Sequence, residues 1–480
     1  MNPLATPLEH YDFQRYSGSE DIHGYLRALT AAAGPYARLD VIGRSAQGRP
    51  LLALVCENPA RQVATRRLRV MLVGSQHGAS EAAGCEALLV LARAVLIGDL
   101  QGLLDDFELV IVPNANPDGR ERDSSRNGND VNINRDFVLL SQPESCALDA
   151  AVLRYEPDVV LDAHESAILK RNSLGREGYL TTFEAQFDIA NNPAIPPALR
   201  HYAERQLLPA LIDTVAARGL QAQRYIREIT STRQVITHGG TTLRKFRNKA
   251  GVRGALTVLL ETPMEPKSGH YPTYRNIGER REKQWCCLQA FLHVVRARHA
   301  EIARVVADRE QLRPRMPLAL NASYVENPQS AHIAIDLRRR DTFLVEPIAF
   351  ADHRHVQEHD HVALPAAYLV IAHTAVFANL LSRHQIPFEV LSAPPRCHVE
   401  RDVLAGGPDA EAACMVVDTD AAAIAPPPGA LRVPVTQRSG RVLPLLLEPR
   451  SQSSVFRYPS FARLIEPRRP AFVARVHRAD

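Results

Sequence analysis

The chain has 480 residues, of which 45% are hydrophobic and 23% charged, and this ordinary globular composition excludes a disordered or fibrous protein. Its 57 basic and 53 acidic residues leave a formal charge of +4, which gives no reason to expect nucleic acid as a partner. Apolar runs stay short of the roughly 18 residues that cross a bilayer, and the first thirty residues lack the apolar core of a signal peptide, so we expect a cytoplasmic protein without a membrane partner.

Short apolar runs alternate with helical patterns over about the first 305 residues. In chain order, the predicted strands are residues 39–43, 51–56, 68–74, 107–113, 158–163 and 255–260, and the predicted helices are residues 22–32, 81–97, 198–218 and a helix that ends near 308. Continuous apolar runs between helices are typical of sheets that are buried on both faces. We therefore predict an α/β fold with a mixed, largely parallel sheet and helices on both faces.

The pattern changes after residue 308. Segments with alternating polarity occur at residues 332–337 and 342–350, a proline-rich break lies at 426–429, and one αβ-like stretch covers 364–391. We predict two domains: residues 1–308, which carry the candidate chemistry, and residues 309–480, a smaller β-rich accessory domain.

Polar residues suited to catalysis follow four of the predicted strands. They are His77 and Glu81 after 68–74, Asn114 to Asp118 after 107–113, His164 after 158–163, and Glu261 after 255–260. In an open α/β sheet, ligands bind in the crevice outside the carboxyl ends of the strands. If the four strands are neighbours, two imidazoles and a carboxylate can meet at one point with a second carboxylate beside them, which describes a catalytic zinc site.

Each residue also has a simpler interpretation when it is taken alone. A single histidine after a strand is commonly a hydrogen-bonded surface or core residue, and Ser80 and Glu81 could serve only to begin a helix. A carboxylate directly after six apolar residues, as at Glu261, needs a cleft or a partner to solvate it. Taken together, the four positions favour the metal site.

Six ordered motifs resemble those of the zinc carboxypeptidases of the carboxypeptidase A type, over most of the first 300 residues. They are VIGRSAQGRPLL at 41–52, His77-Gly78, NANPDG at 114–119, Arg126-Asn127 with NINRDF at 132–137, DAHE at 162–165 and LET at 260–262. The order and the rough spacing of all six agree with the family.

The resemblance implies a role for seven residues. His77, Glu81 and His164 would bind Zn²⁺, and Glu261 would be the general base. Arg126 would stabilise the oxyanion of the scissile carbonyl. Asn134 and Arg135 would hold the terminal carboxylate of the substrate, because a guanidinium binds a carboxylate through two parallel hydrogen bonds.

Three details differ from the family pattern or are left open by it. Three residues separate His77 from Glu81, where the family has two, so Glu81 can reach the metal only if the chain bulges before the helix, which Gly78 permits. Asn132 stands where the family usually has Asp. The tyrosine that many members close over the substrate has three candidates here: Tyr225, Tyr271 and Tyr274.

The sequence thus predicts a zinc metallocarboxypeptidase that hydrolyses an amide next to a free carboxylate, with a peptide or an acylated amino acid as substrate. Two alternatives stay open: an acylase or amidase of the same fold that acts on an N-acyl amino acid or a cell-wall peptide, and a binding module without metal. The floor of the pocket is expected between residues 225 and 260, where the arginines are Arg227, Arg233, Arg244 and Arg247. If one of them lines the pocket, acidic terminal residues would be favoured; otherwise they are solvated surface residues.

Overall fold

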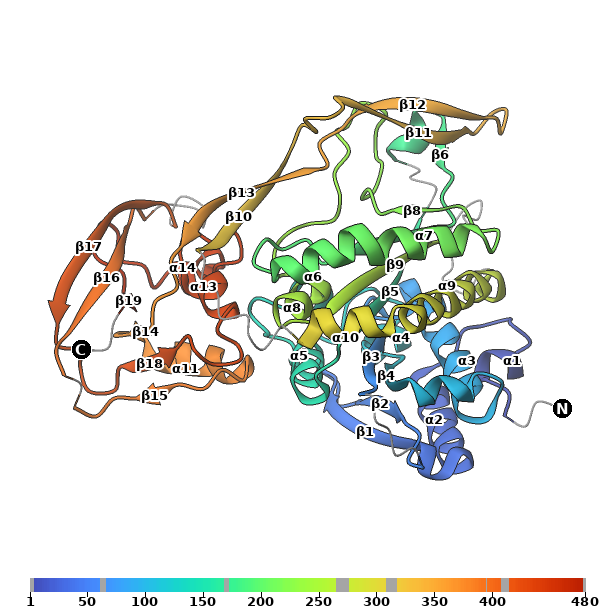
Figure 1. Cartoon of the computed structure of the whole chain (residues 1–480), viewed down its shortest axis with the longest axis horizontal. Coiled ribbons are helices and arrows are strands. Elements are labelled where there is room, and N and C mark those ends of the chain that lie inside the picture. The colour runs from blue at the N-terminus through green and yellow to red at the C-terminus, as the bar shows by residue number, and fades with distance from the viewer. Residues whose placement is uncertain are drawn as a thin grey trace.

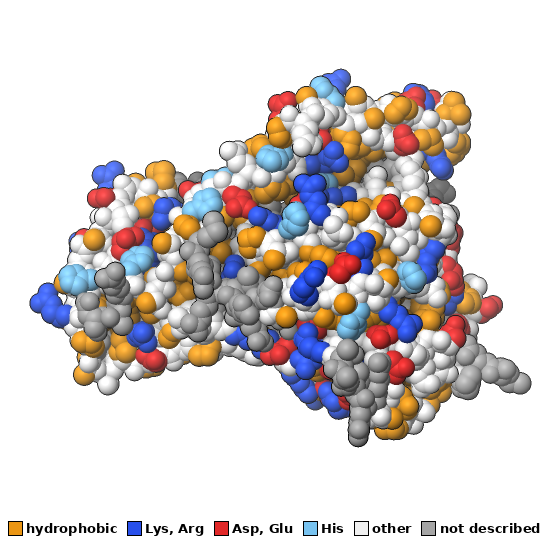
Figure 2. All heavy atoms as spheres, in the orientation of Figure 1, with side chains coloured by type: hydrophobic (Ala, Val, Ile, Leu, Met, Phe, Trp, Pro, Cys, Tyr) orange, Lys and Arg blue, Asp and Glu red, His pale blue; other side chains and the backbone are white. Residues whose placement is uncertain are grey.

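The computed structural model describes residues 4–60, 66–167, 172–264, 276–307, 317–393, 395–406 and 414–477. Within these ranges, no helix combines the length and the apolar character that crossing a membrane requires. Figure 1 shows a larger α/β body built from the first 307 residues, a C-terminal body rich in strands, and an arm of long strands between them. On the face shown in Figure 2, basic and acidic side chains are interspersed, in keeping with the small net charge.

The larger body is built on an eight-stranded sheet with the order β1-β2-β4-β3-β5-β9-β7-β8. Its strands are β1 (Ala37–Arg44), β2 (Pro50–Cys56), β3 (Leu68–Val73), β4 (Phe107–Val112), β5 (Val159–Ala167), β7 (Ala185–Ile189), β8 (Ala222–Arg224) and β9 (Leu256–Met264). The four central strands β4, β3, β5 and β9 are parallel, whereas β1 and β2 are antiparallel and β7 runs against β9. The predicted mixed, largely parallel sheet is confirmed.

Helices cover both faces of this sheet because successive strand residues are buried on opposite sides. Leu72 packs into a core with α2, α3, α7 and α9, whereas its neighbour Met71 packs into a second core with α5 and α8. The helices of this body are α1 (Pro7–His10), α2 (Ser19–Ala33), α3 (Ala83–Ile97), α4 (Pro117–Glu121), α5 (Pro143–Tyr155), α6 (Pro197–Tyr202), α7 (Leu208–Ala216), α8 (Phe246–Val252), α9 (Ile277–Ala297) and α10 (His299–Ala307).

Several predicted elements have different bounds in the structure. The helix expected over residues 198–218 is divided into α6, a π-helical turn at Ala203–Leu207, and α7. Pro209 lies in the first turn of α7 and has no N–H to donate, which explains why the regular hydrogen-bond ladder is interrupted before it. The strands expected to end at residues 163 and 260 continue as a pair to Ala167 of β5 and Met264 of β9.

The C-terminal body is an antiparallel sheet with the order β15-β18-β14-β19-β16-β17, as the β-rich pattern predicts. Its strands are β14 (Ala367–Val370), β15 (Glu389–Val390), β16 (Cys397–Leu404), β17 (Val416–Ile424), β18 (Leu431–Pro434) and β19 (Val473–Val476), and its helices are α11 (Thr374–Arg383), α13 (Val442–Leu447) and α14 (Pro459–Ala462). Phe377, Leu380 and Leu381 of α11 are buried in the core. The helix therefore closes one side of this sheet.

The arm consists of β10 (Leu318–Val325), β11 (His332–Arg339), β12 (Val345–Ala351) and β13 (His355–Val362). β10 pairs with β13, and the β11–β12 hairpin pairs with β6 (Tyr179–Thr181) of the larger body. In Figure 1, the arm leads from the C-terminal body to a position above α7. The predicted domain boundary at 308/309 falls outside the described residues and stays a prediction.

Candidate metal centre and active site

The four strands that carry the candidate residues are neighbours, and their carboxyl ends meet at one edge of the sheet. The order β4-β3-β5-β9 places the segment after β3 beside β5, and β5 beside β9. His164 of β5 is the register partner of Glu261 of β9. The adjacency on which the predicted metal site depends is therefore present.

The chain bulges between His77 and Glu81 before the helix begins. Gly78 has a φ of +53°, which L side chains rarely adopt, and a short 3₁₀ turn covers Gly78–Glu81. A Cβ atom at residue 78 would lie 2.4 Å from the carbonyl oxygen of Ser124. Helix α3 begins only at Ala83, so the extra residue is absorbed in the turn and Glu81 faces the same side as His77.

His77, Glu81 and His164 form a cluster whose donor atoms all lie within 4.8 Å of one another. The Nδ1 atoms of the two histidines lie 2.5 Å and 2.7 Å from the two carboxylate oxygens of Glu81. Two imidazoles and a carboxylate are a donor set that catalytic zinc sites use. The residues present therefore fit a zinc ion.

The outer nitrogen of His164 is positioned by a carboxylate. Its Nε2 atom lies 3.1 Å from Oδ2 of Asp162, and Asp162 also accepts a 2.6 Å hydrogen bond from Gln76. A carboxylate on the far side of a ligand histidine fixes its tautomer, so that the other nitrogen keeps its lone pair for a metal. The Nε2 atom of His77, in contrast, is buried without a hydrogen-bond partner among the described residues.

The charges in the metal-free cluster stabilise one another. Burial alone would lower the pKa of His164, but the carboxylates of Asp162 and Glu81 raise this pKa well above its ordinary value. Burial would likewise raise the pKa of Glu81, and the two histidines hold it below its ordinary value instead. The metal-free cluster thus holds an ionised carboxylate next to a histidine that favours its protonated form, and a divalent cation bound there would take the place of that proton.

Glu261 lies beside this cluster, and its pKa is higher than that of an ordinary glutamate. Burial, with a smaller contribution from Glu81, raises the pKa of Glu261 to about 8, against the opposing charges of His164, Lys245 and Arg247. Its Oε2 atom is buried and has no hydrogen-bond partner among the described residues. A carboxylate with a raised pKa and a vacant acceptor is suited to take and return a proton near neutral pH.

Asn134 and Arg135 line the same cavity as the metal cluster, next to His164. The side chain of Asn134 lies 3.3 Å from Nε2 of His164 and accepts a hydrogen bond from the backbone N–H of Phe246, at the start of α8. The side chain of Arg135 is exposed to solvent and makes no hydrogen bond with the described residues. Both are therefore available to a ligand that enters the cavity, and their role as the carboxylate grip stays a prediction.

Arg126 does not line this cavity. Its side chain is 55% exposed and donates to the backbone carbonyl of Asp130, and it is not among the described residues that line the cavity. Its assignment as the oxyanion arginine stays a prediction. Two cations that do line the cavity near Glu261 are Lys245 and Arg247. Sequence reasoning passed over Lys245, because a lysine among loop arginines carries no pattern of its own.

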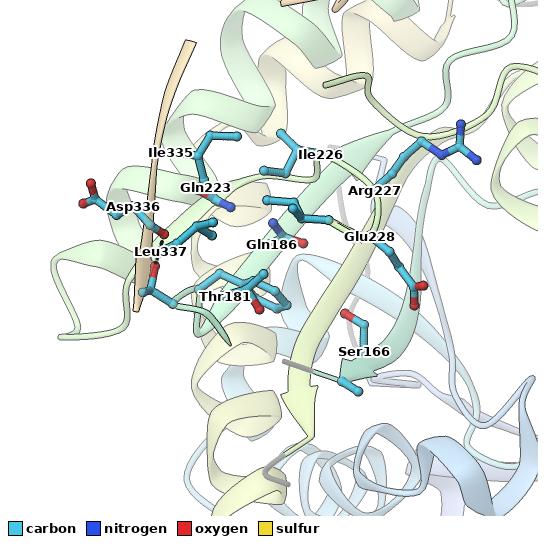
Figure 3. A pocket seen from close by; sticks show the side chains of 14 residues that line it. Ser166, Thr181, Gln186, Gln223, Ile226, Arg227, Glu228, Ile335, Asp336 and Leu337 are labelled. Carbon is cyan, nitrogen blue, oxygen red and sulfur yellow. Dashed lines mark hydrogen bonds between the residues drawn. The ribbon is translucent and has the colours of Figure 1, made fainter. Parts of the chain in front are cut away.

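The cavity has a volume of about 680 Å³, and the segment 225–242 forms much of its rim. This rim is held by the arm: the hydroxyl of Tyr324 donates to the carbonyl of Gly239, and Ile236 bridges to Asp352. Figure 3 shows a narrow neighbouring pocket in which Ile335 and Leu337 of β11 lie beside Ile226 of the rim. The arm thus helps to shape the entrance.

Of the three tyrosine candidates for a lid, only Tyr225 is among the described residues. Its side chain lines the cavity, within electrostatic range of Glu261 and Arg247. Tyr271 and Tyr274 lie outside the described residues. Tyr225 is therefore the candidate that the described structure supports.

Residues 22–150 match the family model described as zinc carboxypeptidase. Carboxypeptidase 2 of Trichophyton rubrum is 26% identical over 260 residues, which cover 51% of this chain and 46% of that protein. Human carboxypeptidase D is 35% identical over 136 residues, or 23% of this chain and 10% of that protein. The chain spans about half the length of the first curated relatives it matches. The crystal structure of a metallo-carboxypeptidase from Burkholderia cenocepacia aligns with a TM-score of 0.44 and 20% identity, over 58% of this chain and 69% of that one.

Proposed function

We propose that this chain, which belongs to the zinc carboxypeptidase family through its residues 22–150, is a zinc-dependent carboxypeptidase that releases the terminal residue of a peptide. The observation that carries the proposal is the convergence of His77, Glu81 and His164 with Glu261 at one sheet edge. When bound there, zinc supplies a Lewis acid that activates water and polarises a carbonyl.

The chain's own residues supply the proton transfers. Glu261 is positioned to accept a proton from the attacking water and to return it to the leaving amine, since its raised pKa makes it a stronger base than a solvated carboxylate. Asp162 keeps the ring of His164 in one orientation during the cycle. The buried environment strengthens each of these interactions relative to water.

Asn134 and Arg135 orient the substrate by binding its terminal carboxylate. Arg135 is free to form a two-point ion pair with the terminal carboxylate, and Asn134 is held by the backbone of Phe246 so that its amide faces His164. A substrate gripped there has its last amide bond close to Glu261. The requirement for a free terminal carboxylate distinguishes this reaction from that of a general amidase.

Metal analysis and matched variants test the proposal. Protein purified without added zinc is expected to contain about one zinc per chain and to hydrolyse blocked dipeptides with a free C-terminus, but not their C-terminal amides. His164→Ala should lose both metal and activity, whereas Glu261→Gln should keep the metal and lose about 10²- to 10⁴-fold in kcat. Asp213→Asn, at an exposed position on α7, is the control that should change neither.

Three results would overturn the proposal. A protein that binds no zinc at micromolar concentrations would be a binding module. Equal hydrolysis of the free acid and of the amide would indicate an amidase. Turnover restricted to N-acyl amino acids would indicate an acylase.

A further inference from the structure

Cationic side chains line the cavity next to the residues that would hold the terminal carboxylate. They lie where the chain enters α8, at Arg244, Lys245 and Arg247. Because the N–H of Phe246 bonds to Asn134, this stretch is fixed beside the predicted carboxylate grip. The side chain of a terminal residue held by Asn134 and Arg135 would therefore point towards these cations.

Too few carboxylates lie close to these three cations to pair with each of them. The side chains of Arg244 and Lys245 make no hydrogen bond or ion pair with the residues that the structure describes. Arg247 contacts Asp188 at 3.2 Å, but Asp188 also faces Arg224 at 3.5 Å, so one carboxylate serves two guanidiniums. The Nε atom of Arg247, whose side chain is 6% exposed, is buried and lacks a partner within the described part of the chain. A buried guanidinium with an unsatisfied N–H is costly unless a ligand pairs with it.

The lowered pKa of Lys245 also indicates an excess of positive charge at this place in the cavity. Burial, together with the charges of Arg247 and Arg135, lowers the pKa of Lys245 to about 8. Glu261 and Glu81 oppose this shift only in part. An anion bound between Lys245 and Arg247 would offset the repulsion between these cations and raise the pKa of Lys245.

Three of the acidic residues that line the cavity are engaged by histidine or arginine side chains. Glu81 faces the two histidines, Asp162 faces His164, and Glu165 forms a buried ion pair with Arg280 at 2.7 Å. A positively charged substrate side chain would thus compete with structural partners for each of them. Glu261 has no hydrogen-bond partner at Oε2 within the described residues, but Lys245 and Arg247 already face it. Where the chain enters α8, the unmatched charge is therefore positive.

The terminal carboxylate of a substrate is not enough to pair with all of these cations. The terminal carboxylate of a peptide is satisfied by the guanidinium of Arg135 and the amide of Asn134. A second anionic group is then needed beside Lys245 and Arg247. We propose that the residue released by this enzyme is a dicarboxylate, aspartate or glutamate, whose side-chain carboxylate is bound by Lys245 and Arg247 with Arg244 at the entrance.

This inference rests on the proposed function, and a panel of blocked dipeptides tests it on the zinc-loaded full chain. Substrates that end in Glu, Gln, Leu and Lys should differ, with kcat/KM for Glu at least tenfold above that for the isosteric Gln. Lys245→Gln should lower kcat/KM for the Glu substrate at least tenfold and change that for the Gln substrate less than threefold. Arg233→Gln, an exposed rim arginine that does not line the cavity, is the matched control and should leave the ratio unchanged.

The two proposals fail in distinguishable ways. Equal turnover of the Glu and Gln substrates, or an undiminished Glu preference in both Lys245→Gln and Arg244→Gln, would overturn the dicarboxylate inference and leave the carboxypeptidase intact. Arg244 is exposed, so its variant is expected to fold even if Lys245→Gln does not.

Binding gives a readout that does not depend on turnover. By calorimetry, N-acetylglutamate should bind the purified full chain at least tenfold more tightly than N-acetylglutamine, and Lys245→Gln should abolish the difference. Such binding without hydrolysis of any dipeptide would support the anion site and contradict the carboxypeptidase. Equal binding of the two ligands would contradict the anion site.

Discussion

The Oδ2 atom of Asp162 lies 3.1 Å from Nε2 of His164, two residues further along β5. Residues two apart on a strand share a face, which is why this short motif can hold a ligand histidine and its orienting carboxylate together. The arrangement makes the affinity for zinc depend on a residue that does not itself belong to the donor cluster.

We therefore expect Asp162→Asn to weaken zinc binding by about 10- to 100-fold, because the ring of His164 loses its anionic partner. Competition with a chromogenic chelator measures the effect. Activity should return at high zinc concentration, as the donor atoms remain. Unchanged zinc affinity in the variant would show that the contact has no part in orienting His164.

The second prediction concerns the turn that brings Glu81 to the cluster. Gly78→Ala should cost about 1–2 kcal/mol for the left-handed backbone alone, and the close approach to Ser124 adds strain that moves the turn. Because Glu81 ends this turn, we expect zinc affinity to fall at least tenfold. Gly102→Ala is the control: a Cβ there meets nothing within 4 Å, and zinc content should not change.

Much of the fold and of the site can be predicted from the sequence because strands that are buried on both faces consist of consecutive apolar residues. β3, β4 and the first part of β9 are covered on both faces, so their runs stand out, and the polar residues after them identify the active edge. The turn at Gly78 follows from the count of residues between His77 and Glu81. These are local signals.

Other features depend on contacts that are distant in sequence. β7 (AQFDI) is fully buried but contains Gln186 and Asp188, so its sequence shows no apolar run; Asp188 is accommodated by Arg247 and Asn191. Lys245 reaches the cavity only because α8 packs beside β9, and the arm shapes the rim from more than 80 residues away. Such contacts cannot be read from spacing alone.

The third prediction concerns the buried ion pair between Glu165 and Arg280. Both side chains are inaccessible, and Glu165 also accepts a hydrogen bond from the N–H of Ala83 at the start of α3. Arg280→Met leaves this carboxylate buried and unpaired, which typically costs about 3–5 kcal/mol. Urea denaturation should show a lower midpoint. Adding Glu165→Gln, which keeps an acceptor for Ala83, should recover part of the loss, and no recovery would argue against an unpaired charge as the cause.

The last prediction concerns pH and the contact between the two bodies of the molecule. Nζ of Lys249 in α8 lies 2.7 Å from Nδ1 of His384, just after α11, and the Nε2–H of His384 donates to the carbonyl of Val138. Burial lowers the pKa of Lys249 to about 7, with Arg253 adding to the shift and Asp149 opposing it. A neutral amine can donate to the imidazole nitrogen without placing an uncompensated charge in the core.

The sign of the pH effect follows from proton binding. Between pH 7 and the ordinary lysine pKa of about 10.4, the unfolded chain binds a proton that the folded chain does not, so this group makes the free energy of unfolding rise with pH, by at most about 1.4 kcal/mol per pH unit. Below pH 7 both states are protonated and the contribution is constant. Lys249→Met should therefore show a weaker rise in denaturation midpoint between pH 7 and 9.5 than the parent chain. Parallel pH profiles for the two proteins would mean that Lys249 stays charged in the folded state and that the contact with His384 is an ordinary ammonium hydrogen bond.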